Sequence, residues 1–166
     1  QLMNAFPSLD DFVLEGMVDQ LKSDAFGYRA PYIRDTVTIL RENGGEARLE
    51  SQRTESTVDA KKFLQSLAGV GPKVADCILL MSLSHSSVVP IDVHMWNITR
   101  ILYMTYLPAK MNTKDYSSIG KFYEGKYGDY AGWAQAVLFN AQMSKKRTQT
   151  TEIKSEPTKK ARKCGK

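Results

Sequence analysis

The fold is decided by Leu67 to Trp96, "LAGVGPKVADCILLMSLSHSSVVPIDVHMW", which places a glycine-rich turn between two stretches of helical periodicity. Pro72 follows the turn at a position that suits the first turn of a helix. We expect a tight hairpin of two helices, in which Gly69 and Gly71 can take positive φ at little cost. Because the first amides of a helix have no partner inside it, those from Gly69 to Val74 are expected to point outward and bind a phosphate. A plain helical hairpin with a glycine cap is the alternative.

Two charged residues lie at the two helix mouths of this segment. Lys73 falls in the first turn of the second helix, where the positive end of the helix dipole favours the neutral amine of a nucleophilic lysine. Asp92 follows "VVP", which forces an extended entry, and occupies the N-cap position of "VHMWNITRIL". Taken singly, a surface lysine and a helix cap explain both residues. If the chain brings them together beside a phosphate clamp, the pair indicates chemistry on a DNA sugar.

The chain between Ser8 and Met143 shows helical periodicity almost throughout, and no alternating apolar run is long enough to form a sheet. Ser8 and Asp11 form a capping-box-like start to the first helix. The Gly44-Gly45 pair is expected to end the second helix, and a polar linker at 50–57 follows. Helices are expected at 9–22, 31–43, 58–67, 72–83, 93–104, 113–123 and 130–143. The predicted fold class is all-α, a helical bundle with a helix-hairpin-helix DNA-binding motif.

Charge divides the 166-residue chain, whose net charge is +5, into two parts. Nine of the 23 basic residues but only two of the 18 acidic ones lie from Lys145 onward, which leaves residues 1–144 with a net charge of −2. We expect one domain at 1–144 and a disordered basic tail at 145–166, because the tail has no apolar period with which to fold. The tail is interpreted as a nuclear-import signal or a non-specific DNA tether, or else as a solubilising segment.

Other features indicate an intracellular protein. No apolar run approaches the roughly 18 residues of a membrane span, and the N-terminus does not resemble a signal peptide. Cys77 and Cys164 are too widely separated to suggest a disulfide framework. The chain starts at Gln1, within an amphipathic stretch, and is therefore expected to be a piece of a larger protein. The expected location is the nucleus, with the mitochondrion left open.

Four blocks of sequence carry a family resemblance. "LAGVGPKVADCILLMSL" followed by "VVPIDVHMW", with "GYRAPYI" and "YAGWAQAVLFNAQ", resembles the helix-hairpin-helix glycosylases, specifically the eukaryotic 8-oxoguanine DNA glycosylase/AP lyases. The resemblance runs from about Phe6 to Gln142. The chain departs from that family in having Ala68 where a proline is usual. It also lacks the family's N-terminal mixed domain and with it part of the lesion pocket.

The resemblance implies a base-excision repair enzyme that removes 8-oxoguanine from duplex DNA. Lys73 would attack C1′ of the damaged nucleotide and form a Schiff base, which permits β-elimination of the 3′ phosphate. Asp92 would stabilise the sugar cation that develops as the base leaves. A glycosylase for a different lesion and a non-catalytic DNA-binding module remain the alternatives.

The family likeness also implies a pocket for the base, which must first leave the stack. Gln135 and Phe139 lie four residues apart on the last helix and so share a face. By resemblance, Gln135 hydrogen-bonds the base edge, Phe139 stacks on one side of the base, and Cys77 lies on the other. Met81 lines the same pocket. Core packing is the alternative for Cys77, Met81 and Phe139.

The resemblance also implies several contacts to DNA. Tyr28 and Arg29 match the wedge at the lesion and the residue that contacts the orphaned cytosine, and the alternative is a helix-entry loop with an extended arginine. His94 matches a residue near the DNA phosphate, or else is a structural donor. His85, in a serine-rich loop, has no assigned role. The hairpin residues predicted to contact DNA are Gly69, Val70, Gly71 and Val74.

No cofactor is expected, because two distant cysteines cannot supply the four ligands of the iron–sulfur relatives. Lys73 argues against the alkyl-purine branch, which keeps the aspartate but lacks the lysine. A monovalent or calcium ion on backbone carbonyls is implied by the resemblance, near Gln65, Leu67 and Val70. The expected partner is double-stranded DNA with an oxidised guanine opposite cytosine, bound by a monomer and away from membranes.

Overall fold

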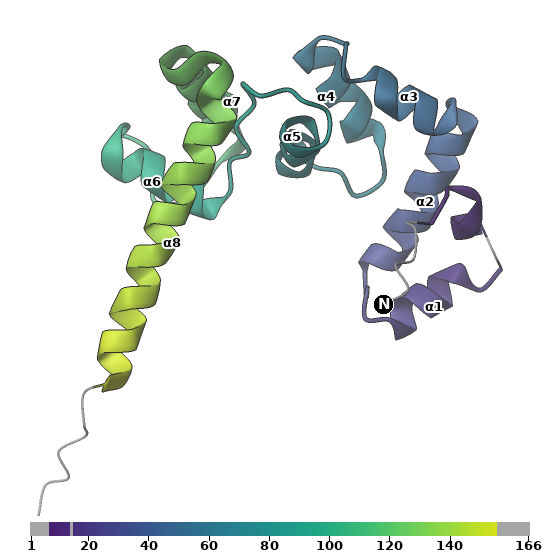
Figure 1. Cartoon of the computed structure of the whole chain (residues 1–166), viewed down its shortest axis with the longest axis horizontal. Coiled ribbons are helices and arrows are strands. Elements are labelled where there is room, and N and C mark those ends of the chain that lie inside the picture. The colour runs from purple at the N-terminus through teal and green to yellow at the C-terminus, as the bar shows by residue number, and fades with distance from the viewer. Residues whose placement is uncertain (1–6, 14, 156–166) are drawn as a thin grey trace, which may run out of the picture.

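The computed structural model describes residues 7–13 and 15–155, and this part of the chain contains helices and no strand. Figure 1 shows two groups of helices joined by a connector at residues 82–92. The first lobe contains η1 (Asp10–Val13), α1 (Met17–Ser23), α2 (Arg29–Glu42), α3 (Gly45–Ser51), α4 (Thr57–Ser66) and α5 (Pro72–Met81). The second lobe contains α6 (Val93–Leu102), α7 (Thr113–Tyr127), η2 (Gly128–Tyr130) and α8 (Ala131–Ser155). The predicted all-α fold is confirmed.

Each lobe has its own hydrophobic core. The core of the first lobe joins α2, α4 and α5 and consists of Leu40, Ala60, Leu64, Leu67, Ala75, Leu79 and Leu83. The core of the second lobe joins the end of the connector to α6, α7 and α8, and its largest buried members are Ile91, Met95, Trp96, Ile119 and Tyr123. Two separate cores mean that the connector and the contacts across the seam set how the lobes meet.

The starts of the helices follow from their capping residues. Ser56 accepts a hydrogen bond from the amide of Asp59 at the start of α4, and Asn112 accepts one from the amide of Asp115 at the start of α7. Asp92 caps α6 in the same way. Pro31 lies in the first turn of α2, as predicted.

The first predicted helix is wrong as a continuous element. Residues 10–13 form a single 3₁₀ turn, and α1 begins only at Met17. The cause is Gly16, whose φ of 80° is left-handed and breaks the helical path. The predicted capping pair does form, because the amide and hydroxyl of Ser8 both donate to Asp11 Oδ2 at 2.8 Å. These hydrogen bonds lower the pKa of Asp11.

The helix α3 is missing from the sequence-based expectation, and the polar segment after it is well anchored. Gln52 is only 1% exposed, and its carbonyl oxygen accepts a hydrogen bond from Nε2 of His85 at 2.9 Å. Nδ1 of His85 lies 3.1 Å from the Thr57 hydroxyl. A carbonyl can only accept, so Nε2 carries the ring proton and Nδ1 accepts from Thr57.

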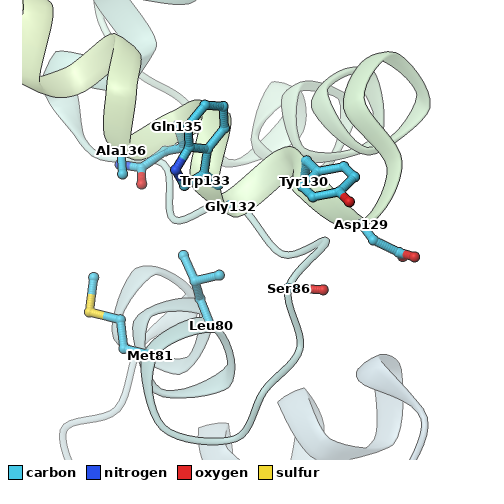
Figure 2. Close-up of a pocket in the computed structure, with 9 residues that line it drawn as sticks. All are labelled: Leu80, Met81, Ser86, Asp129, Tyr130, Gly132, Trp133, Gln135 and Ala136. Atoms are coloured by element: carbon cyan, nitrogen blue, oxygen red, sulfur yellow. The ribbon is translucent and has the colours of Figure 1, made fainter.

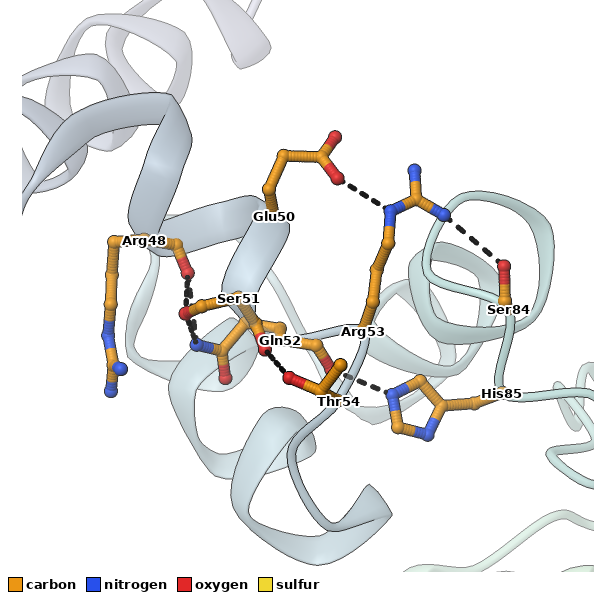
Figure 3. Close-up of polar contacts among 8 residues, drawn as sticks. All are labelled: Arg48, Glu50, Ser51, Gln52, Arg53, Thr54, Ser84 and His85. Atoms are coloured by element: carbon orange, nitrogen blue, oxygen red, sulfur yellow. Dashed lines mark hydrogen bonds and ion pairs between the residues drawn. The ribbon is translucent and has the colours of Figure 1, made fainter.

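The same anchor continues through Arg53. Figure 3 shows its guanidinium between Glu50 Oε2, at 2.6 Å, and the hydroxyl of Ser84, at 3.2 Å. His85, which has no assigned role from the sequence, therefore joins Arg53 in tying the start of the connector to the α3–α4 turn.

The last helix extends beyond its predicted end. The structure continues α8 through Lys145 to Ser155, where the sequence predicts a disordered tail. No glycine or proline interrupts residues 145–155, and extending an existing helix avoids the cost of starting a new one. Residues 156–166, including Cys164, lie outside the described residues.

Candidate active site

The hairpin between α4 and α5 is built around one left-handed glycine. Gly69 has a φ of 75°, whereas Gly71 has a φ of −85° and an extended backbone, so the prediction of positive φ holds for Gly69 alone. The Thr36 hydroxyl donates to the carbonyl of Ala68 at 3.1 Å and ties the turn to α2. This hydrogen bond fixes the position of the turn relative to α2.

The predicted outward amides are present with one exception. The amide of Val70 donates to the carbonyl of Leu67 within the turn, at 3.2 Å, and is therefore used. Among the described residues, no acceptor bonds the amides of Gly69, Gly71, Lys73 or Val74. These four groups, at the turn and the N-terminus of α5, are suited to bind one or more oxygens of a phosphate.

Lys73 and Asp92 stand on different lobes. Lys73 lies in the first turn of α5, is exposed, and forms no ion pair or hydrogen bond within the described residues. Asp92 is half-buried, and its Oδ1 accepts a hydrogen bond from the amide of Met95 at 2.8 Å. Within the same described part of the chain, Asp92 Oδ2 has no hydrogen-bond donor. The amine and one carboxylate oxygen are therefore both available to a ligand.

A polar contact that the sequence did not suggest joins α7 of the second lobe to α5 of the first. The Tyr116 hydroxyl on α7 lies 2.7 Å from Oδ2 of Asp76 on α5 and 3.2 Å from the amide nitrogen of Ile91. Asp76 is 3% exposed and pairs with Lys61 on α4 at 2.6 Å. These residues are more than a helix length apart in sequence, so no local pattern indicates the contact.

A pocket of about 720 Å³ opens between the end of α5 and the start of α8. Figure 2 shows Met81 and Gln135, two of the predicted base-binding residues, at its edge. Met81 is 73% exposed, which excludes core packing as its role. The pocket is otherwise lined by Leu80, Ser86, Asp129, Tyr130, Gly132, Trp133 and Ala136.

The other two predicted base-binding residues do not line this pocket. Phe139 packs against the second-lobe core, and its ring meets that of His94 edge-on, with centroids 5.7 Å apart. Cys77 is a free, half-buried cysteine on α5. Their predicted contacts with a base stay predictions, as does the contact of His94 with a phosphate.

The predicted wedge residues lie beside the hairpin. Tyr28 and Arg29 line the same groove of about 850 Å³ as Gly69 and Val74. Tyr28 is 74% exposed, and the Arg29 guanidinium lies over its ring, 5.6 Å from the centroid. A projecting aromatic ring and a cation thus lie next to the turn that is predicted to bind a phosphate.

No group of three or more histidine, cysteine, aspartate or glutamate side chains that could hold a metal occurs among the described residues. The predicted ion site on the carbonyls of Gln65, Leu67 and Val70 stays a prediction, and the Leu67 carbonyl already accepts the amide of Val70. Within residues 7–13 and 15–155, no helix combines the length and the apolar character needed to cross a membrane.

Comparison with known proteins assigns the chain to a family, although no protein-family profile matches it. The N-glycosylase/DNA lyase OGG1 of Arabidopsis thaliana is 40% identical over 146 residues, which cover 86% of this chain and 40% of that protein. The chain belongs to the OGG1-type N-glycosylase/DNA lyases. The resemblance seen in the sequence is confirmed. The chain spans less than half the length of the curated relatives it matches.

Solved structures of OGG1-type proteins share the fold. The 8-oxoguanine glycosylase/lyase of Clostridium acetobutylicum, in its apo-form, is 32% identical, with a TM-score of 0.68 over 84% of this chain and 46% of that one. The structure of MBOgg1 in complex with a low-affinity DNA ligand is 29% identical, with the same TM-score over 84% of this chain and 45% of that one. The chain therefore keeps the helical arrangement of these relatives.

Proposed function

We propose that this chain forms the catalytic part of a DNA glycosylase that excises an oxidised guanine and then cleaves the strand. The observation that carries the proposal is the free amine of Lys73 in the first turn of α5, directly beside unpaired hairpin amides. A backbone that binds a phosphate brings the attached sugar close to this amine. The family membership supports the same assignment.

The chemistry follows from the two charged residues. The Lys73 amine forms a bond to C1′ while the bond from C1′ to the base breaks, and the base leaves with its electron pair. Asp92, with one carboxylate oxygen unoccupied by any described donor, stabilises the positive charge that develops on the sugar. Opening of the sugar ring gives an imine between Lys73 and C1′. Loss of a C2′ proton then expels the 3′ phosphate.

The substrate of this reaction is proposed to be duplex DNA with 8-oxoguanine opposite cytosine, bound by one copy of the protein in the nucleus. Gln135 and Met81 at the pocket edge offer an amide for the edge of an extruded base and an apolar contact for its face. Tyr28 and Arg29 offer a ring to fill the vacated stack and donors for the unpaired cytosine. The similarity to the 8-oxoguanine glycosylase/lyase of Clostridium acetobutylicum supports the choice of lesion.

Borohydride trapping tests the proposal, because reduction of the imine joins enzyme and DNA covalently. We expect trapping on duplex DNA that contains 8-oxoguanine opposite cytosine, and its loss in Lys73→Gln while duplex binding survives. Lys62→Gln is the matched control, since Lys62 is also an exposed helical lysine. Full trapping of Lys73→Gln would refute the nucleophile. Binding without any trapping in the parent protein would favour a non-catalytic DNA-binding module.

A further inference from the structure

The hydroxyl of Tyr116 occupies the seam between the two lobes. It lies 2.7 Å from Asp76 Oδ2 and 3.2 Å from the amide nitrogen of Ile91. An amide can only donate and a carboxylate only accepts, so the hydroxyl accepts from Ile91 and gives its single proton to Asp76. Both hydrogen-bonding roles of the hydroxyl are thereby fixed by its neighbours.

The surroundings keep the Tyr116 hydroxyl protonated. Burial, together with the hydrogen bond to the carboxylate of Asp76, raises the pKa of Tyr116 far above its ordinary value. Lys61 lies 2.6 Å from the other carboxylate oxygen of Asp76, and its ammonium also lies over the Tyr116 ring, 5.2 Å from the centroid. The buried charge of Asp76 is thus paired and hydrogen-bonded, as a buried carboxylate requires.

Each hydrogen-bond partner of Tyr116 lies close in sequence to one of the two proposed reacting residues. Asp76 follows Lys73 by three positions on α5 and therefore lies on the same face of that helix. Ile91 is fully buried in the second-lobe core and immediately precedes Asp92. A single hydroxyl therefore joins the helix that carries the amine to the turn that carries the carboxylate.

We propose that Tyr116 is a positioning residue, whose hydroxyl fixes the separation between Lys73 on the first lobe and Asp92 on the second. This inference rests on the proposed function, because it assumes that both residues act on one sugar. The two lobes have separate cores, so neither core by itself sets that separation. A displacement of about 1 Å between reacting groups can cost about 10²-fold in rate.

The test compares two tyrosines of the same helix. Tyr116→Phe removes the bridging hydroxyl and keeps the ring. Tyr123→Phe is the matched control, because it removes a buried hydroxyl that lies 3.0 Å from Thr99 inside the second lobe. We expect Tyr116→Phe to lower the single-turnover rate of base excision by about 10- to 100-fold. Tyr123→Phe is expected to lower the melting temperature without changing that rate more than about twofold, since its hydroxyl spans no seam.

Two further readouts separate positioning from folding. Borohydride trapping on a preformed abasic site needs the Lys73 amine but no base departure, so it should fall less than excision in Tyr116→Phe. A purely structural role would lower both equally. Asp76→Asn leaves one acceptor oxygen where Tyr116 and Lys61 both donate a hydrogen bond. It should therefore lose stability and, like Tyr116→Phe, lower excision more than abasic-site trapping.

The outcomes distinguish this inference from the proposed function. If the parent protein is not trapped on lesion DNA, the proposed function fails. If the parent is trapped but Tyr116→Phe and Tyr123→Phe excise at the same rate, the positioning role alone is wrong. Equal losses of excision and abasic-site trapping in Tyr116→Phe would also overturn it.

Discussion

Gly69 packs against the side chain of Tyr32 so closely that a Cβ atom on residue 69 would lie 2.7 Å from Tyr32 Cδ2. Tyr32 extends from α2, so the turn between α4 and α5 is shaped by a helix outside the hairpin. The contact and the positive φ both require glycine at this position.

Gly69→Ala should destabilise the protein and weaken duplex binding. The left-handed backbone costs an alanine about 1–2 kcal/mol, and the Tyr32 side chain must also move. Gly71→Ala is the matched control, because Gly71 has an extended backbone with open space around the site of a Cβ. Urea unfolding and duplex affinity of both variants would measure the difference. Equal effects of the two substitutions would contradict the role of Gly69.

Asp92→Asn should separate capping from catalysis. Asparagine caps a helix about as well as aspartate, so the variant should melt within a few degrees of the parent and bind DNA as well. A neutral amide cannot stabilise the developing sugar cation, and the loss of such a group costs on the order of 10²–10³ in rate. Single-turnover excision and thermal melting on one preparation would decide between the roles. Excision within about threefold of the parent would leave Asp92 as a cap only.

Gly132→Ala should disturb the seam between the lobes. The amide of Gly132 donates to the carbonyl of Ser86 at 3.0 Å, and a Cβ there would collide with the Leu80 side chain and lie 2.8 Å from that carbonyl oxygen. Overpacking of this kind costs about 1–3 kcal/mol. Gly125→Ala, in open space on α7, should instead stabilise by about 0.5–1 kcal/mol. Denaturant unfolding that gives both variants the same sign would refute the close contact at Gly132.

Stability should fall in alkaline solution partly through Tyr103. Its hydrogen bond with Tyr127, followed by burial, raises the pKa of Tyr103 from 10.0 to about 12. The unfolded chain therefore loses this proton at lower pH than the folded one, and the free energy of unfolding decreases as pH rises from 10 to 12. Tyr103→Phe should make that decline shallower. Tyr106→Phe, at a more exposed tyrosine, is the control, and an identical decline in both variants would exclude Tyr103 as a contributor.

The sequence predicts helices well where a local signal marks their start. Asp92 before α6 and Pro72 at the start of α5 are signals of this kind, and both helices lie where expected. The helix α3 has a polar sequence, and its surroundings depend on contacts with distant residues, such as that of the Gln52 carbonyl with His85. No periodicity can indicate such contacts.

The candidate site divides in the same way. Lys73 and Asp92 are identified by their positions at the starts of two helices, and local sequence signals mark both starts. The hydrogen bond between Tyr116 and Asp76 joins residues 40 positions apart and depends on how two lobes meet. The extended backbone of Gly71 likewise depends on which residue ends the turn and begins α5. The motif "GVG" does not specify that residue.

Because the two lobes have separate cores, we expect the seam between them to open before either lobe unfolds. The hairpin amides and Lys73 adjoin the unit built on the first core, and Asp92 adjoins the unit built on the second. Local opening at the seam parts the amine from the carboxylate without melting either unit. If the proposed function holds, a heated or partly denatured sample should therefore lose base excision while it still binds DNA, and such damaged molecules would block access to the lesions they occupy.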